Sequence, residues 1–256
     1  MSRPTRSESV DAGGTGRRSR RGRSATTTYG EASARPLHIL VFLAPLILLY
    51  EIGAIVYLPG ETIAARGILA RVFESFGIVG LHLPAGLLVI VLLVWQVLLR
   101  DRWRVRGSYL GFMLMEACLW TVPLFLLALL MTAGPAVQAE AATSAVELRE
   151  RSWQARLTLS IGAGLYEELL FRMILIAAAH FVLADLLRLA DHWAKIGAAV
   201  ISAVGFMLYH HATTPVESAF FLVAGLYFAG LYIVRGFGIV VTVHALYDVL
   251  ALVVMG

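Results

Sequence analysis

Seven apolar stretches, separated by short polar segments, follow one another from residue 37 to the end of the chain. Most are close to the length of about 20 residues that a helix needs to cross the hydrocarbon core of a bilayer. The pattern therefore predicts an all-α, polytopic transmembrane helix bundle of about seven spans, within a range of six to eight. Several stretches are short or interrupted, which favours some broken or tilted helices. The stretches are 37–58, 79–99, 109–132, 157–183, 196–210, 219–234 and 238–255.

The first 36 residues differ from the rest, because Ser, Thr, Gly and Arg take the place of almost every large aliphatic side chain. Such a segment buries too little apolar surface to offset the entropy that it loses on ordering. The sequence thus predicts two parts, a disordered basic tail over residues 1–36 and a transmembrane helical domain over residues 37–256.

Composition supports the membrane class, since 59% of the residues are hydrophobic and 15% are charged. In soluble domains, about half of the residues are hydrophobic and about a quarter are charged. The net charge of +4 comes from the tail, where eight arginines face three acidic residues. Because the tail holds a single aromatic side chain to stack on a base, Tyr29, its charge indicates contact with anionic lipids and no nucleic-acid partner.

Arginine and lysine positions also predict the orientation. If each stretch spans the membrane, the tail, the loop 100–106, the region 188–195 and Arg235 share one side, with fifteen basic residues against five on the other. The positive-inside rule then puts the N-terminus in the cytoplasm. Lys195 is the only lysine beside twenty arginines, a bias that suggests a GC-rich bacterial genome and hence the bacterial inner membrane.

The segment 142–156, which precedes the core of the fourth stretch, mixes Glu147, Arg149 and Glu150 with apolar side chains. An amphipathic helix at the membrane interface fits this pattern, and an irregular segment fits it equally. In either case we expect the chain to enter the fourth span from the membrane surface.

The fourth stretch contains three charged residues within six positions, Glu167, Glu168 and Arg172. A charge inside a span costs about 3 kcal/mol on insertion scales, so such groups usually face the protein interior and serve a function. Glu168 and Arg172 lie four residues apart with the acid first, which favours an ion pair on one helical face. Glu167 points about 100° away and is left for another task. The alternative is one structural charge cluster formed by all three.

Two later stretches carry further polar groups. The fifth ends in FMLYHH, with His210 and His211, and the last contains VHALYD, with His244 and Asp248 on one helical face. A carboxylate and an imidazole that share a water molecule can deprotonate it, which is the general-base step of peptide hydrolysis. A second polar pair facing them can stabilise the oxyanion that develops. The sequence therefore predicts a hydrolytic site if the three stretches converge.

Taken in order, these residues resemble the signature of the CAAX protease and bacteriocin-processing (CPBP) family of intramembrane proteases, which includes the type II CAAX prenyl endopeptidases. That signature is Glu-Glu-x-x-x-Arg, then Phe-x-x-x-His, then His-x-x-x-Asn or Asp, each on its own transmembrane helix. The resemblance covers about residues 109–256, which would form a CPBP-type core. The chain supplies Glu167-Glu168-x-x-x-Arg172, Phe206-x-x-x-His210 and His244-x-x-x-Asp248.

The resemblance implies an intramembrane endopeptidase of the glutamate type, with no metal and no other cofactor. It implies that Glu167 and His210 activate the attacking water, while His244 and Asp248 stabilise the oxyanion. The residues that would support this site are Glu168 and Arg172, which would hold its geometry, and His211, which would face another direction on its helix.

The position of Asp248 departs from the prenyl-processing members, which look like they use Asn there. Because a carboxyl group donates a hydrogen bond only when it is protonated, we expect Asp248 to orient His244 as an alternative role. The widest substrate class that the residues support is a membrane-embedded peptide or lipopeptide in an apolar cavity between helices.

Three other interpretations stay open. Two Glu and three His near one another would suit a zinc-dependent membrane protease, although the chain contains no HExxH motif. A non-catalytic membrane scaffold or immunity protein would use the same fold without chemistry. A transporter would use the carboxylates as ion or proton sites, although no inverted repeat of the motifs is evident.

Simple, straight spans put the predicted site residues at different depths. If the fourth stretch enters from outside, Glu167 and His210 lie toward the outer side and His244 lies nearer the inner side. Kinked helices, re-entrant segments or a different number of spans would bring them together.

Overall fold

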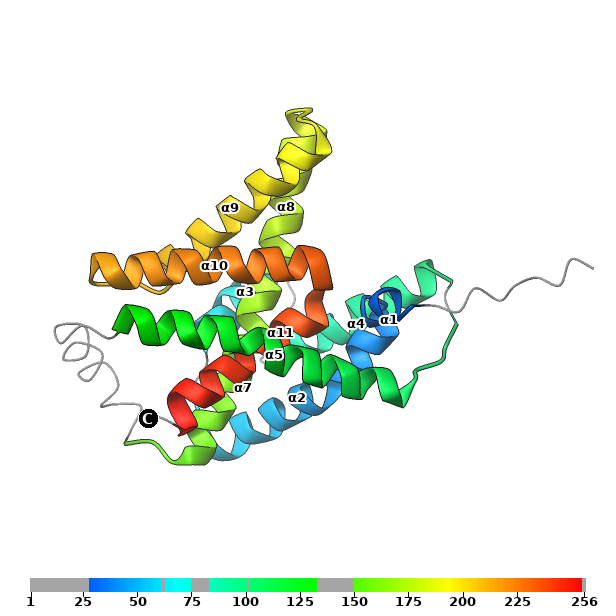
Figure 1. Cartoon of the computed structure of the whole chain (residues 1–256). Coiled ribbons are helices and arrows are strands. Elements are labelled where there is room, and N and C mark those ends of the chain that lie inside the picture. Colours follow the sequence, from blue (N-terminus) through cyan, green and yellow to red (C-terminus); the bar gives the residue numbers. More distant parts are fainter. Residues whose placement is uncertain (1–27, 61–62, 75–82, 101, 133–149, 255–256) are drawn as a thin grey trace, which may run out of the picture.

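Every regular element in the part of the chain that the structure describes is a helix (Figure 1). The computed structural model describes residues 28–60, 63–74, 83–100, 102–132 and 150–254. The predicted all-helical membrane bundle is confirmed, because five helices are long and apolar enough to cross a membrane and two shorter apolar helices accompany them. The five are Pro36–Tyr57, Gly107–Met131, Trp153–Leu186, Asp191–Tyr209 and Pro215–Arg235, and the two are Ala85–Leu98 and Phe237–Val253.

The helices begin and end where local signals in the sequence are strongest. Helix α10 starts with a capping box, in which Thr214 and Glu217 satisfy each other's backbone N–H groups, and ends at Gly236 with a φ of 89°. The elements in chain order are α1 (Tyr29–Ser33), α2 (Pro36–Tyr57), α3 (Ala64–Glu74), α4 (Leu83–Leu98), α5 (Gly107–Thr132), α7 (Trp153–Glu168), the π-helical segment η1 (Leu169–Leu175), α8 (Ile176–Phe181), the π-helical segment η2 (Val182–Leu186), α9 (Asp191–Tyr209), α10 (Pro215–Arg235), α11 (Phe237–Val249) and the π-helical segment η3 (Leu250–Val254).

The predicted disordered tail is too long at its C-terminal end, because α1 is a helix with a capping box at its start. The Tyr29 hydroxyl donates a hydrogen bond to Glu116 on α5, and Arg235 on α10 forms an ion pair with the same carboxylate. Burial and the Glu116 carboxylate raise the pKa of the Tyr29 phenol, which therefore keeps its proton. This polar anchor orders a segment that has few large aliphatic side chains. Residues 1–27 lie outside the described residues.

Helix α11 lies in the middle of the bundle (Figure 1), and every side chain from Phe237 to Ala245 is buried. It packs against α7, α5, α10 and α2, as expected for a helix that is apolar on all sides. Gly164 on α7 permits a close approach, since a Cβ there would lie 2.7 Å from the backbone nitrogen of Ala245. Because Ala245 follows His244, the missing side chain at Gly164 brings polar groups of α7 and α11 within reach of each other.

Helices α8 and α9 form a hairpin that extends away from the rest of the bundle (Figure 1). Helix α7 continues without a break through η1, α8 and η2 as one helix of 34 residues, which ends at Leu186. The chain then reverses, and the 19 residues of α9 pack back along α8 and η1. The first arm of the hairpin, from η1 through α8 to η2, is about as long as α9. The end of α9 therefore returns to the level at which η1 begins.

One helix of the structure was not predicted, and one predicted segment is described only in part. Helix α3 was not predicted, because only one face of it is apolar: Ala65 and Leu69 are buried while Arg71 is exposed. In the predicted lead-in segment 142–156, residues 142–149 lie outside the described residues. In the described part of this segment, Ser152 is the N-cap of helix α7, which begins at Trp153.

Candidate functional site

Glu167, at the end of α7, faces the imidazoles of two other helices. Its Oε2 atom lies 3.6 Å from Nε2 of His210 and 3.8 Å from Nε2 of His244. Both distances exceed a direct hydrogen bond, and Oε2 is buried without a hydrogen-bond partner among the described residues. Both imidazoles therefore lie close to one carboxylate oxygen, at separations that a bridging water molecule fits better than a direct hydrogen bond does.

His210 is fixed in one tautomer by its own helix. Nδ1 lies 2.8 Å from the Phe206 carbonyl oxygen, and a carbonyl only accepts, so Nδ1 carries the proton and donates. The ring stacks on Phe221 of α10, with 4.1 Å between centroids. In the neutral imidazole, the lone pair of Nε2 then points toward Glu167 and is available to take a proton.

His244 stands between carboxylates on α7 and on its own helix. Its Nδ1 atom lies 2.7 Å from Oε1 of Glu168, and Nε2 lies 3.5 Å from Oδ2 of Asp248. The ring stacks on Phe228 of α10 at 4.7 Å between centroids. Glu168 therefore makes the shorter contact with His244, and Asp248, for which orientation of His244 is the alternative role, makes the longer one.

The predicted ion pair between Glu168 and Arg172 forms, with 3.1 Å between Oε2 and Nε, and neither side chain is exposed. Arg172 also donates to the carbonyl of Gly225 on α10 at 3.4 Å. Its guanidinium lies over the ring of Phe206 on α9, 4.4 Å from the centroid, which adds a cation–π contact. One buried cation thus joins η1, α9 and α10 behind the site.

The helix widens to π geometry directly after Glu168. In a π segment each backbone hydrogen bond spans one residue more than in an α-helix. The Phe171 carbonyl accepts such a bond from the Ile176 N–H and a second one from the Ser202 hydroxyl of α9, at 2.9 Å. Because η1 carries Arg172 and α9 carries His210, this bond helps to fix the two halves of the site against each other.

The structure brings Glu167, Glu168, Arg172, His210, His244 and Asp248 together, as their order in the sequence suggested. The conflict of depth is resolved by the hairpin, because α9 returns to the level of Glu167 before it ends. His211 is the exception. It terminates α9 in the left-handed region, with a φ of 47°, and its side chain is exposed while Glu167 and His244 are buried.

Sequence reasoning missed Tyr209, the residue before His210. Its hydroxyl accepts a hydrogen bond from the Ala65 backbone N–H of α3 at 3.0 Å. Nothing in the spacing of the motifs signals this contact, since 144 positions separate Tyr209 from Ala65.

A second buried polar cluster lies beside the first. Arg66 of α3 donates to the Tyr50 hydroxyl at 3.1 Å and pairs with Glu51 at 3.5 Å. The Tyr166 hydroxyl, on the residue before Glu167, donates to Glu51 at 2.8 Å. This cluster holds the start of α3 against α2 and α7.

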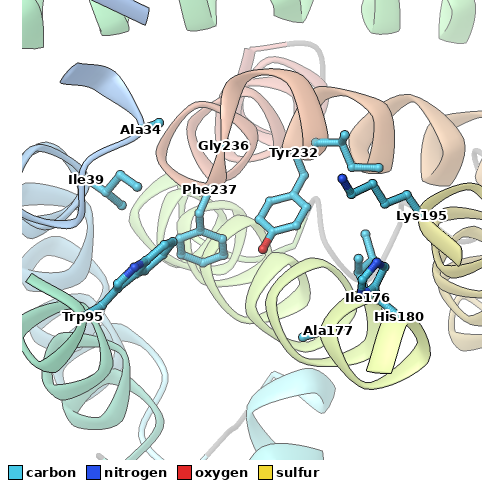
Figure 2. A pocket seen from close by; sticks show the side chains of 11 residues that line it. Ala34, Ile39, Trp95, Ile176, Ala177, His180, Lys195, Tyr232, Gly236 and Phe237 are labelled. Atoms are coloured by element: carbon cyan, nitrogen blue, oxygen red, sulfur yellow. The ribbon is translucent and has the colours of Figure 1, made fainter. Parts of the chain in front are cut away.

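Two apolar crevices open between the helices. One of about 560 Å³ lies between α2, α5, α7 and α11 and is lined in part by Thr242 and Ala245, close to His244 in the chain. The other, of about 450 Å³, is lined by Trp95, Tyr232, His180 and Lys195 among others (Figure 2). No residue of the Glu167 cluster lines either crevice, and the first crevice is the one to which α11, the helix of His244, contributes several side chains.

Within the described residues, no group of three or more His, Cys, Asp or Glu side chains has the arrangement of a metal site. The shortest histidine contact, from Nδ1 of His244 to Glu168, is a hydrogen bond.

One comparison with known proteins gives a family for part of the chain. Residues 150–250 match the family model described as Type II CAAX prenyl endopeptidase Rce1-like. The matched range contains every residue of the cluster, from Glu167 to Asp248. Neither the curated proteins nor the solved structures that were compared give a match.

Proposed function

Residues 150–250 belong to the type II CAAX prenyl endopeptidase Rce1-like family, and from this premise we propose that the chain hydrolyses a peptide bond inside the membrane with a water molecule activated by Glu167 and His210. The observation that carries the proposal is the position of Glu167 Oε2, 3.6 Å and 3.8 Å from two imidazole Nε2 atoms. These separations fit a shared water better than direct hydrogen bonds.

In the proposed reaction, the water oxygen attacks the scissile carbonyl carbon while Glu167, assisted by His210, takes the water proton. A tetrahedral intermediate forms, and its oxyanion lies on the side of His244 and Asp248. When the C–N bond breaks, the proton returns from Glu167 to the leaving amine. Because the nucleophile is water, no covalent acyl intermediate forms.

His244 supplies the oxyanion donor in this proposal. Its Nδ1 proton is directed to Glu168 at 2.7 Å, so Nε2 donates to an oxyanion only if the ring carries both protons. The Glu168 carboxylate balances that positive charge, and Arg172 in turn balances Glu168 at 3.1 Å. Asp248, 3.5 Å from Nε2, adds a second donor when it is protonated.

Metal independence is part of the proposal. We expect cleavage by the purified protein in vesicles to persist when a chelator such as phenanthroline is added, because the water is activated by side chains alone. The measurement compares initial rates of cleavage before and after dialysis against the chelator. A loss of activity that added zinc restores would favour the zinc protease over the glutamate mechanism.

The substrate class that we propose is a membrane-embedded peptide or lipopeptide whose apolar part lies in the crevice between α2, α5, α7 and α11. Two features support this route: the lining is almost wholly apolar, and part of it comes from α11, the helix that carries His244. A prenylated peptide and an unmodified transmembrane peptide are the first two reporters to test in vesicles. If the protein cleaves neither peptide, that result favours the non-catalytic scaffold.

Gly111 of α5 offers a way to test the crevice, because it lines the cavity and a Cβ built on it meets no atom within 4 Å. We expect Gly111→Leu to raise KM about tenfold with little change in kcat, since the added side chain occupies substrate space without straining the helix. The matched control is Gly86→Leu on α4, where a Cβ is equally free but lies outside the crevice. Equal KM values for both variants would exclude this crevice as the substrate route.

The location and the other partners complete the proposal. We propose that this integral membrane protein lies in the bacterial inner membrane with its N-terminus in the cytoplasm, where the arginines of the tail contact anionic lipids and no nucleic acid. The basic excess of the loops on that side supports the orientation. Protease accessibility of an N-terminal tag in sealed, inside-out vesicles tests it.

A further inference from the structure

We propose that one face of α10 is a positioning surface for the two imidazoles of the site, an inference that rests on the proposed function. On this face, the phenyl ring of Phe221 holds the imidazole of His210. The phenyl ring of Phe228, two turns later, holds the imidazole of His244. Helix α10 carries none of the three sequence motifs, so its part in the site follows from the spacing of its side chains and from their contacts.

The positioning surface consists of Phe221, Gly225 and Phe228. With 3.6 residues per turn, positions i, i+4 and i+7 lie within about 60° of one another around the helix axis, and seven residues rise by about 10.5 Å. The two phenyl rings therefore project from the same side of α10 at two different heights, with a glycine between them.

The first ring fixes the plane of His210. Phe221 lies nearly parallel to the imidazole, with 4.1 Å between centroids and 20° between planes. The hydrogen bond from Nδ1 to the Phe206 carbonyl at 2.8 Å fixes which edge of the imidazole faces the backbone, but a single hydrogen bond still allows the ring to tilt. The stack removes that tilt, so Nε2 stays directed at Glu167 Oε2, 3.6 Å away.

The second ring repeats this arrangement at His244. Phe228 stacks on the imidazole with 4.7 Å between centroids and 15° between planes. Nδ1 again has a polar contact, here with Glu168 Oε1 at 2.7 Å, and Nε2 lies 3.8 Å from Glu167 Oε2. Each imidazole is thus held by one polar contact at Nδ1 and one phenyl face from α10, while its Nε2 is directed at the same carboxylate oxygen.

The parallel geometry distinguishes these two contacts from the packing around them. Among the aromatic contacts of the described residues, the two stacks have the smallest angles between ring planes. Phe206 of α9, in contrast, meets Phe221 and Phe228 edge-on, at 63° and 77°. A parallel ring covers one whole face of its partner and so limits its tilt, which an edge-on ring does not. The arrangement that fixes a ring plane is therefore found at both imidazoles.

Gly225 fixes the position of α10 between the two stacks. A Cβ there would lie 2.9 Å from Cα of Ala203, so the two helix backbones meet closely at this point. The Gly225 carbonyl also accepts a hydrogen bond from Arg172 of η1 at 3.4 Å. Because α10 cannot slide or rotate without losing both contacts, the two phenyl rings keep their places relative to α9 and η1.

Phe221→Leu tests the positioning surface in the full chain in vesicles, with the reporter peptide that the wild type cleaves. Leucine keeps an apolar side chain but offers no ring face, and misalignment of a catalytic group by about 1 Å can cost about 100-fold in rate. We expect kcat to fall at least about tenfold with KM changed less than about twofold. Phe221→Tyr keeps the ring face and should restore kcat to within about twofold of the wild type.

Phe181→Leu is the matched control, because it makes the same change at an exposed position of α8 and should leave kcat and KM unchanged. A role of Phe221 in packing alone would lower the unfolding temperature of Phe221→Leu without lowering kcat per folded molecule. Phe228→Leu should also lower kcat about tenfold. Because the Arg172 guanidinium lies 5.2 Å from the Phe228 ring, this variant should lose some thermal stability as well.

A second measurement needs no activity and separates this inference from the proposed function. Nitrogen-15 NMR of histidine-labelled protein in bilayers identifies the His210 signals by their loss in His210→Gln. We expect single, narrow His210 signals in the wild type and in Phe221→Tyr, and broadened or doubled signals in Phe221→Leu. If the wild type cleaves neither reporter peptide, broadened signals retain the positioning surface while the protease is overturned. Narrow signals in Phe221→Leu, or an unchanged kcat in that variant, overturn the positioning surface and leave the protease standing.

Discussion

Glu167→Gln abolishes peptide hydrolysis, with kcat falling by about a thousandfold or more, while the protein keeps its fold. The amide has the size of the carboxylate but cannot take a proton from water, and general-base catalysis of this kind contributes about 10² to 10⁴ in rate. The substitution also removes one negative charge from a cluster that contains Glu168 and Asp248. We therefore expect no loss of thermal stability.

The experiment measures single-turnover cleavage in vesicles and the unfolding temperature in detergent on the same preparations. Glu217→Gln is the control, because Gln serves a capping box as well as Glu does and Glu217 caps α10 away from the site. Full activity in Glu167→Gln would refute the proposed mechanism. A wild type that is as silent as the variant toward both reporter peptides would instead favour the scaffold.

Arg172→Met has the largest expected effect on stability. Arg172 and Glu168 are both fully buried and lie 3.1 Å apart, so removing the cation leaves an uncompensated buried carboxylate and lowers the free energy of unfolding by about 3 to 5 kcal/mol. The contacts of Arg172 with Gly225 and with the Phe206 ring are lost as well. Unfolding by dodecyl sulfate in mixed micelles measures the change.

A double variant separates the charge from the packing. Glu168→Gln combined with Arg172→Met removes both buried charges, and we expect it to regain much of the lost stability, because a buried pair replaced as a unit is often nearly neutral. Activity should stay at least about tenfold reduced, since His244 then lacks the carboxylate at 2.7 Å. Arg188→Ala, at an exposed position of the α9 hairpin turn, is the control for loss of an arginine. Equal stability of Arg172→Met and Arg188→Ala would contradict the argument.

Features that depend on neighbouring positions along one helix were predictable from the sequence. The spacing of Glu168 and Arg172 predicts their ion pair because residues four apart share a helical face, and the pair forms. The same holds for His244 and Asp248, which lie 3.5 Å apart. The hydrophobic length of each stretch predicted a membrane helix for the same reason, since burial in lipid depends on local composition.

Features that depend on how helices pack were predicted poorly or not at all. The bond from His244 to Glu168 joins residues 76 positions apart, and nothing in either motif states which carboxylate is nearer. His211 was expected to support the site, yet the chain turns there with a positive φ and leaves its side chain exposed. Helix α3 escaped prediction because a short amphipathic helix has too weak a hydrophobic signal to distinguish it from a loop.

The amino-acid sequence by itself determined that this is a helical membrane protein and which polar groups each helix carries, because helix formation and membrane burial follow from residue type and from spacings of a few positions. Only the tertiary structure decided that these groups meet. The close approach of α11 at Gly164, the return of α9 alongside η1 and the docking of α3 through Ala65 onto Tyr209 each depend on packing between segments far apart in the chain. The depth of a side chain and the orientation of its reactive atom are set by that packing, which no local pattern encodes.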